Sequence, residues 1–155
     1  MRIGVLSDTH GLLRPQALAA LRGCEHILHT GDVGDAKILD ALRAIAPVTA
    51  IRGNVDTAGA CAALPTTEAV QLAGRWFYLL HNLDDLDLNP KAAGMDAVIY
   101  GHTHRPEIAQ RDGVLYLNPG SSGPRRFLLP VTVAVVQASA AELHAEIVPL
   151  ALDAQ

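Results

Sequence analysis

The chain has 155 residues, of which 50% are hydrophobic but only 4% aromatic, so one domain spanning residues 1–155 is expected, with a core of Ala, Leu, Val and Ile. A formal net charge of -4 argues against broad nucleic-acid binding, which needs a basic surface. The two cysteines, Cys24 and Cys61, form neither a disulfide framework nor a CxxC motif, which favours a reducing, cytoplasmic location.

The first third of the chain alternates short strands with helices. A helix is predicted over residues 14–24, where Pro15 suits the first turn and Gly23 stops the helix. A second helix is predicted over residues 35–47, capped by Asp35. Strands are predicted around these helices at residues 2–7, 26–30 and 47–51. Because continuous apolar strands that alternate with helices usually form parallel sheets, a largely parallel sheet covered on both faces is expected.

Strands dominate from residue 68 onward, so the second half is expected to add a further layer of sheet. One short helix is considered there, near residues 89–94. The predicted strands of this half are 75–80, 96–100, 114–118, 131–136 and 144–150.

No membrane association is expected. The longest apolar run, residues 127–136, contains a proline and a threonine and is too short to span a bilayer. The N-terminal segment reaches Asp8 without the long apolar stretch of a signal peptide. A soluble protein follows from these two observations.

Polar residues follow most of the predicted strands. In open α/β sheets ligands bind beyond the carboxyl ends of the strands, so these loops are expected to converge on one patch. Three of them place glycine directly before a residue that can bind a metal: Gly31-Asp32, Gly53-Asn54 and Gly101-His102. Glycine lets the backbone turn sharply and approach a bound group closely.

The strand ends together supply a set of metal-binding side chains: Asp8, His10, Asp32, Asn54, His81, His102 and His104. Imidazole nitrogen with a minority of carboxylate and amide oxygen suits Mn, Fe, Zn, Ni or Co, whereas Mg and Ca prefer oxygen ligands. Seven ligands are too many for one four-coordinate ion but suit two ions that share a bridging ligand. Two ions roughly 3.5 to 4 Å apart can activate water and clamp a phosphoryl group.

The ordered set SDTH, GD, GN, His81 and GHTH resembles the calcineurin-like metallophosphoesterases, in particular their small single-domain phosphodiesterase branch. The resemblance runs from Asp8 to residues 118–121 and covers nearly the whole chain. It implies an α/β (α+β) fold in which two mixed β-sheets pack as a sandwich flanked by α-helices, with a dinuclear metal centre at one end.

The resemblance also implies a role for each ligand. By the family pattern one ion is held by Asp8, His10 and His104. The other is held by Asn54, His81 and His102. Asp32 bridges the two ions, and a hydroxide between them attacks phosphorus in line. The implied catalytic residues are Asp32, Asn54 and His102, and the cofactor is a pair of divalent transition-metal ions, with Mn favoured over Ni, Fe, Zn or Co.

The sequence departs from the family pattern in two places. Many larger relatives have a histidine directly after the GN pair, whereas this chain has Val55 followed by Asp56. Because a general acid contributes about 10²- to 10⁴-fold, its absence predicts that diesters with low-pKa leaving groups are better substrates than phosphomonoesters. Asn82 stands where glycine commonly follows His81, and asparagine tolerates unusual backbone angles. The acidic stretch 83–90 is expected to reshape the mouth of the site and to repel polyanions.

Simpler explanations exist for each motif taken alone. Asp8 can cap a turn, the Gly-Asp and Gly-Asn pairs are common in turns, and His81 can bond a carbonyl. The ordered set favours a metal site over these. Residues 118–123 are interpreted as a turn or as a loop that supports the metal site. Three histidines lie outside the pattern and are interpreted as structural or exposed: His26, His29 and His144.

Other hydrolytic and nucleotide-binding motifs are missing. GSSG at residues 120–123 departs from the G-x-S-x-G nucleophile elbow, and no arginine follows either cysteine at a spacing of six. The first strand is followed by Asp-Thr-His rather than Asp-x-Asp, and no G-x-G-x-x-G motif follows it. Metal-assisted hydrolysis remains.

The sequence therefore predicts a divalent-metal-dependent phosphodiesterase acting on a small phosphodiester. The alternative is a catalytically weak or inactive protein-interaction scaffold. The retromer subunit of this fold looks like a phosphoesterase that has become such a scaffold. The complete set of seven ligands favours the enzyme, because a scaffold has no chemical need for them. A homo-oligomer formed through exposed strand edges stays open.

Overall fold

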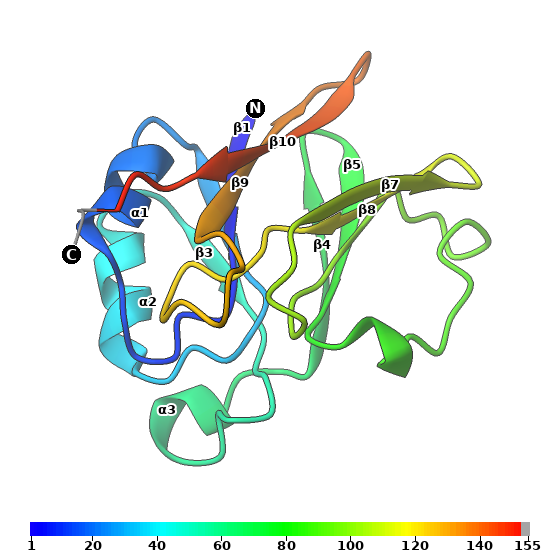
Figure 1. The fold of residues 1–155 in the computed structure, drawn as a ribbon. Coiled ribbons are helices and arrows are strands. Elements are labelled where there is room, and N and C mark those ends of the chain that lie inside the picture. Colours follow the sequence, from blue (N-terminus) through cyan, green and yellow to red (C-terminus); the bar gives the residue numbers. More distant parts are fainter. Residues whose placement is uncertain (153–155) are drawn as a thin grey trace.

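The computed structural model describes residues 1–152, which form two five-stranded β-sheets packed face to face (Figure 1). The first sheet has the strand order β10-β9-β1-β2-β3 and the second β4-β5-β6-β8-β7. The strands of the first sheet are β1 (Arg2–Leu6), β2 (His26–His29), β3 (Val48–Ala50), β9 (Thr132–Ala138) and β10 (Leu143–Pro149). Those of the second are β4 (Thr67–Leu72), β5 (Arg75–Leu80), β6 (Ala97–Ile99), β7 (Glu107–Arg111) and β8 (Val114–Asn118).

Both sheets are mixed, as the predicted fold class requires. In the first, β1, β2 and β3 are parallel, while β9 and β10 add antiparallel strands. In the second, β5, β6 and β8 are parallel, and the edge strands β4 and β7 are antiparallel. The parallel sheet expected from the first third of the chain is thus confirmed for β1, β2 and β3, which form one side of the first sheet, and the C-terminal hairpin β9-β10 extends it on the other side.

Three apolar layers hold the sheets together. The central one lies between the sheets and joins Val5 and Leu28 of the first to Phe77 and Leu117 of the second. A second packs helices α1 (Pro15–Leu21) and α2 (Ala36–Arg43) on the outer face of the first sheet. The third covers the outer face of the second sheet with apolar side chains from residues 83–95. This segment contains only the 3₁₀ turn η1 (Leu83–Asp85), so helices flank one sheet and a folded loop flanks the other.

All eight predicted strands and both predicted helices are present, the helices being shorter than the predicted ranges at seven and eight residues. The Asp35 side chain caps α2 by accepting from the Lys37 N–H at 2.9 Å. The helix considered near residues 89–94 is wrong: hydrogen-bonded turns form there and Gly94 closes them at φ +79°. Two strands, β4 and β7, and the short helix α3 (Gly59–Ala62) were missed by the sequence patterns. Within residues 1–152 no helix is long and apolar enough to cross a bilayer.

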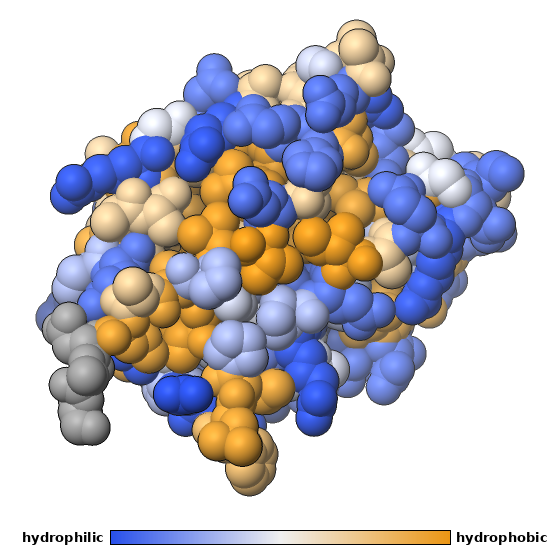
Figure 2. All heavy atoms as spheres, turned by 45° about the horizontal axis from the view of Figure 1, so that its top comes forward, coloured by the Kyte–Doolittle hydropathy of each residue, from blue (hydrophilic) through white to orange (hydrophobic). Residues whose placement is uncertain are grey.

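The parallel strands of both sheets point their carboxyl ends toward the same end of the sandwich, the lower end in Figure 1. Figure 2 brings the opposite, upper end forward, where apolar side chains gather in the middle of the view and hydrophilic ones surround them. The loops that follow the parallel strands therefore meet at the lower end, and these loops carry the predicted ligands.

Candidate metal centre

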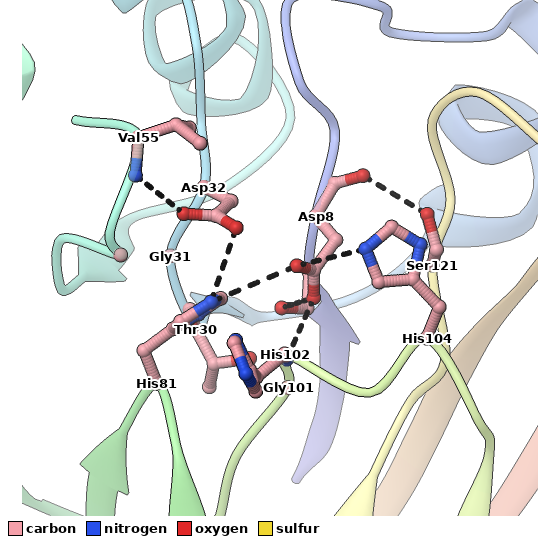
Figure 3. A network of polar contacts seen from close by, with 12 residues as sticks. Asp8, Thr30, Gly31, Asp32, Val55, His81, Gly101, His102, His104 and Ser121 are labelled. Atoms are coloured by element: carbon pink, nitrogen blue, oxygen red, sulfur yellow. Dashed lines mark hydrogen bonds and ion pairs between the residues drawn. The ribbon is translucent and has the colours of Figure 1, made fainter. Parts of the chain in front are cut away.

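Loops from both sheets bring the predicted ligands to one place. Figure 3 shows Asp8, Asp32, His81 and His104 directed into a common space between the ends of the two sheets. Asp8 follows β1 and Asp32 follows β2, whereas His81 follows β5 and His104 lies after β6. The expected convergence of distant loops is thus present.

One group of donors surrounds Asp8. Its Oδ1 lies 3.7 Å from His10 Nε2 and 3.4 Å from His104 Nε2. Donor atoms of these three residues all lie within 4.8 Å of one another, close enough to hold a single ion. These are the three side chains that the family pattern assigns to the first ion.

A second group surrounds Asp32. Its Oδ2 lies 3.1 Å from His81 Nε2 and 3.5 Å from His10 Nε2, so the carboxylate faces both groups. One terminal atom of the Asn54 amide lies 3.1 Å from His81 Nε2 and 3.2 Å from Asp32 Oδ2. Asp8 Oδ1 is 3.8 Å from His81 Nε2, which leaves Asp8 and Asp32 side by side between the two groups.

His102 stands apart from the other six. Its backbone N–H donates to Asp8 Oδ2 at 3.1 Å, but its side chain is exposed. The His102 ring centroid is 5.3 Å from that of His81, edge to face. The structure thus brings six predicted ligands into contact and leaves the His102 imidazole at the rim, beside His81.

The backbone at the ligands is unusual. Among residues 1–152, eight non-glycine residues have positive φ, and five of them are predicted ligands: Asp8 (56°), His10 (46°), Asp32 (54°), His102 (73°) and His104 (64°). Left-handed backbone costs a non-glycine residue about 1 kcal/mol or more and concentrates at functional sites. The fold therefore holds these five residues in place against a local conformational cost.

The glycines before the ligands make room for neighbouring loops. A Cβ on Gly53 would overlap the Asp32 carboxylate, and one on Gly101 would overlap the Ser7 hydroxyl and come within 2.6 Å of Asp8 Oδ2. A Cβ on Gly31 would lie 2.8 Å from His81 Nδ1. At all three positions the absence of a side chain therefore lets the backbone lie close to neighbouring parts of the candidate site.

Gly53→Ala is expected to weaken metal binding, because the added methyl group must displace the Asp32 carboxylate. We expect the affinity for Mn²⁺ to fall roughly tenfold or more, as it does when the support of a metal ligand is disturbed. Titration calorimetry measures this directly. Gly94→Ala is the control: no atom lies within 4 Å of the added methyl group, so this variant introduces only backbone strain, at φ +79°, outside the ligand loops. Equal affinities of the two variants would contradict the expectation.

Electrostatics keep both carboxylates charged. Burial acts to raise the pKa of Asp8, but the neighbouring His10 and His104 imidazoles outweigh it and hold that pKa well below its usual range. Burial likewise opposes ionisation of Asp32, whose pKa is nevertheless lowered by His81 and by the Val55 N–H, which donates to Oδ1 at 3.0 Å. Two adjacent ionised carboxylates at the end of a buried sheet favour a cation between them.

Several buried polar atoms of the site have no hydrogen-bond partner in the described part of the chain: Asp8 Oδ1, His10 Nε2 and His104 Nδ1. The first two belong to the donor groups described above. His81 donates from Nδ1 to the Thr30 carbonyl at 2.7 Å, so in the neutral ring Nε2 is the free acceptor and faces Asp32. The Asn54 amide faces these same atoms: with its nitrogen inward it donates to His81 Nε2 and Asp32 without a metal, and with its oxygen inward it adds a third acceptor for a cation. The donor set fits divalent transition metals.

Two residues outside the predicted set connect the loops that carry the candidate ligands through hydrogen bonds. The Asp56 carboxylate is buried and accepts three backbone N–H groups, from Val33 (3.1 Å), Gly34 (3.0 Å) and Gly53 (2.9 Å). His29 is fully buried and bonds the Gly31 N–H and the Thr9 hydroxyl. Both side chains therefore join loops that carry different ligands.

The loop at residues 118–123 supports the site from the other side. The Asn118 amide donates to the Gly101 carbonyl and to the Thr103 hydroxyl, both at 3.1 Å. The Ser121 hydroxyl donates to the Asp8 carbonyl at 3.0 Å. Of the two interpretations of this segment, a simple turn and a support for the metal site, these contacts favour the second.

Sequence comparison places these features in a family. The family model for the calcineurin-like phosphoesterase superfamily domain matches residues 1–141. The chain is 34% identical over 160 residues to a probable metallophosphoesterase of Methanothermobacter thermautotrophicus, covering 96% of this chain and 92% of that protein. It is 31% identical over 151 residues to the phosphodiesterase YfcE of Escherichia coli, covering 78% and 79%.

Solved structures agree on the fold. An archaeal phosphodiesterase superposes with a TM-score of 0.78 at 25% identity, covering 96% of this chain and all of that one. Vps29 of Entamoeba histolytica in complex with zinc gives a TM-score of 0.73 at 22% identity, covering 96% and 99%, and shows likeness of fold. On the match of the family model over nearly its whole length, the chain belongs to the calcineurin-like phosphoesterase superfamily.

Proposed function

We propose that this protein is a dinuclear metal-dependent phosphodiesterase that hydrolyses a small phosphodiester. One observation carries the proposal: two groups of donor atoms, around Asp8 and around Asp32, adjoin each other through these two carboxylates. Membership of the superfamily implies divalent metal ions and a phosphoric ester as substrate. Relatives named phosphodiesterase support the choice of a diester.

The proposed roles of the side chains are those that the family pattern implies. Asp8, His10 and His104 would hold one ion and Asn54, His81 and His102 the other, with Asp32 between them. Bound divalent ions, Mn in first place, supply an activated water for in-line attack and neutralise the phosphoryl oxygens. Asn54 and the rim residue His102 lie where they can orient the phosphoryl group. Asp32, with Oδ1 fixed by the Val55 N–H, presents Oδ2 to the centre.

No acid side chain next to Asn54 serves the leaving group. Val55 is 44% exposed and occupies the position of the missing histidine. Asp56 cannot replace it, because both of its oxygens accept backbone N–H groups. The leaving group must therefore depart without protonation from this loop.

We expect bis(p-nitrophenyl) phosphate to be hydrolysed with a higher kcat/KM than p-nitrophenyl phosphate. Among methyl aryl diesters, the rate should fall steeply as the pKa of the leaving phenol rises, because no acid protonates it. Initial rates with Mn²⁺ across such a series measure both effects. Val55→His should flatten this dependence, since it supplies the missing acid. A monoester that is turned over faster than the matched diester would refute the preference.

A protein-interaction scaffold is the second candidate. Phe127 and Leu128 are 92% and 91% exposed, an unusual exposure for two adjacent large apolar residues, and they could contact a partner. The likeness of fold to Vps29 is compatible with this function. Residual rates that are the same in the wild type, Asp32→Ala and His102→Ala would favour the scaffold. Cytoplasmic location and a homo-oligomer stay predictions.

A further inference from the structure

A cavity of about 770 Å³ adjoins the candidate metal centre. Three candidate ligands, Asn54, His81 and His102, line it on one side, so a molecule in the cavity lies directly beside them. Small-molecule sites have volumes of about 300–1,000 Å³, and this cavity therefore has room for an organic group of nucleoside size.

The remaining walls suit an organic group with hydroxyls. Tyr78 and Leu80 of β5 contribute an aromatic ring and an apolar side chain. Thr57, Thr66 and Thr67 also line the cavity, and each hydroxyl can donate and accept a hydrogen bond. Apolar surface with a few polar groups is the usual lining of a site for a small organic molecule.

The charges around the cavity are unbalanced. Asp85 and Asp87 line it, are exposed, and form no ion pair with a cationic side chain within residues 1–152. Arg52 is the one lysine or arginine that lines the cavity, and its Nη1 donates to the Ala62 carbonyl at 3.2 Å. Asp56 adds a further negative charge, already bonded to backbone N–H groups. Away from the ligands, the walls therefore carry net negative charge.

We propose, on the basis of the phosphodiesterase function above, that this cavity holds one ester group of the substrate and that Asp85 and Asp87 select against further negative charge on that group. The preferred substrate is a phosphodiester in which one ester group is neutral and carries hydroxyls. Its single charge, on the phosphoryl group, lies at the metal centre, away from the two aspartates. A terminal phosphate on the organic group would instead face them.

A matched pair of substrates tests this selection. Thymidine 5′-(p-nitrophenyl phosphate) has a free 3′-hydroxyl, and its 3′-phosphorylated form carries a charged phosphate group on that oxygen; the aspartate variants separate the effect of its charge from that of its size. In the manganese-loaded wild type we expect a higher kcat/KM for the 3′-hydroxyl compound. In the double variant Asp85→Asn/Asp87→Asn this preference should shrink about 4- to 25-fold, because each exposed charge contributes a factor of about 2 to 5. Added salt should shrink it in the wild type as well.

The control is Asp84→Asn/Asp112→Asn, which removes the same formal charge from exposed positions that do not line the cavity. Asp84 belongs to η1 itself and Asp112 to the turn between β7 and β8. This variant should keep the wild-type preference. A preference that is the same in all three proteins, or one that favours the 3′-phosphate in the wild type, overturns the proposal.

Failure of the proposed function gives a different result. It would appear as no release of p-nitrophenol from either compound by the wild type. The two compounds then serve as uncleaved ligands, and calorimetric titration compares their affinities. Weaker binding of the 3′-phosphorylated compound, relieved in Asp85→Asn/Asp87→Asn, supports selection by the cavity, whereas equal binding overturns it.

Discussion

Replacing Asp32 with asparagine is expected to lower manganese-dependent hydrolysis of an aryl phosphodiester by about 10²- to 10³-fold or more, a loss typical of removing one charged or donor group from a catalytic centre. Asp32 Oδ2 is within 3.5 Å of donor atoms from His10 and His81. Asparagine has nearly the same shape but no negative charge, so one substitution weakens both groups of donors. The affinity for Mn²⁺ should fall together with kcat.

The measurement is kcat and KM at saturating Mn²⁺, combined with calorimetric titration of the metal-free protein. Asp40→Asn is the matched control, since the Asp40 side chain is 74% exposed and only pairs with Arg43 on the surface of α2. Its rate should stay within about twofold of the wild type, because exposed pairs contribute little. If Asp32→Asn keeps the metal-dependent rate of the control, Asp32 is not a bridging ligand.

Apolar runs in the sequence predicted all five strands of the first sheet and the three central strands of the second, but not the two edge strands of the second sheet. The missed strands β4 (TEAVQL) and β7 (EIAQR) are mostly exposed edges of the second sheet. Their residues are strands because they pair with β5 and β8, and no continuous apolar run marks them. Such pairing depends on tertiary structure rather than on local pattern.

The site residues that could be predicted from the sequence are those marked by residue type and by their position at the end of a strand. Ligand types after glycine at the strand ends identified the side chains that the fold brings together. No local sequence pattern marked Asp56 and His29 as residues of the site. Asp56 accepts backbone N–H groups from a loop distant in sequence, and His29 accepts the N–H of Gly31, which precedes a ligand. His29 was interpreted as structural or exposed, and it proves to be fully buried. Only the position of Asp56 close to Asn54 could have drawn attention to it.

The hydrogen bonds of His29 fix its protonation state. Nδ1 accepts the Gly31 N–H at 3.1 Å, so the neutral ring carries its proton on Nε2. Nε2 lies 3.0 Å from the Thr9 hydroxyl, which in turn donates to the Val33 carbonyl at 2.8 Å. A second proton, on Nδ1, would face the Gly31 N–H and break this chain. Burial accordingly lowers the pKa of His29 from 6.5 to about 4.

The metal-free protein is therefore expected to lose stability through His29 as the pH falls from about 6.5 to about 4. In this range the unfolded chain takes up a proton that the folded protein refuses, so the contribution is complete above pH 6.5 and lost as the pH approaches the folded pKa. A shift from 6.5 to about 4 corresponds to about 3 kcal/mol in the free energy of unfolding.

His81, whose pKa is raised against burial by Asp32, acts in the opposite sense, so the wild type alone does not isolate the effect of His29. Comparison with the variant His29→Gln isolates it, because glutamine does not titrate, while its side-chain amide N–H can still donate to the Thr9 hydroxyl. Urea unfolding in the presence of a chelator should show the stability difference between wild type and His29→Gln narrowing by about 3 kcal/mol across this range. Parallel pH profiles of the two proteins would mean that the buried ring is protonated as readily in the folded state as in the unfolded chain.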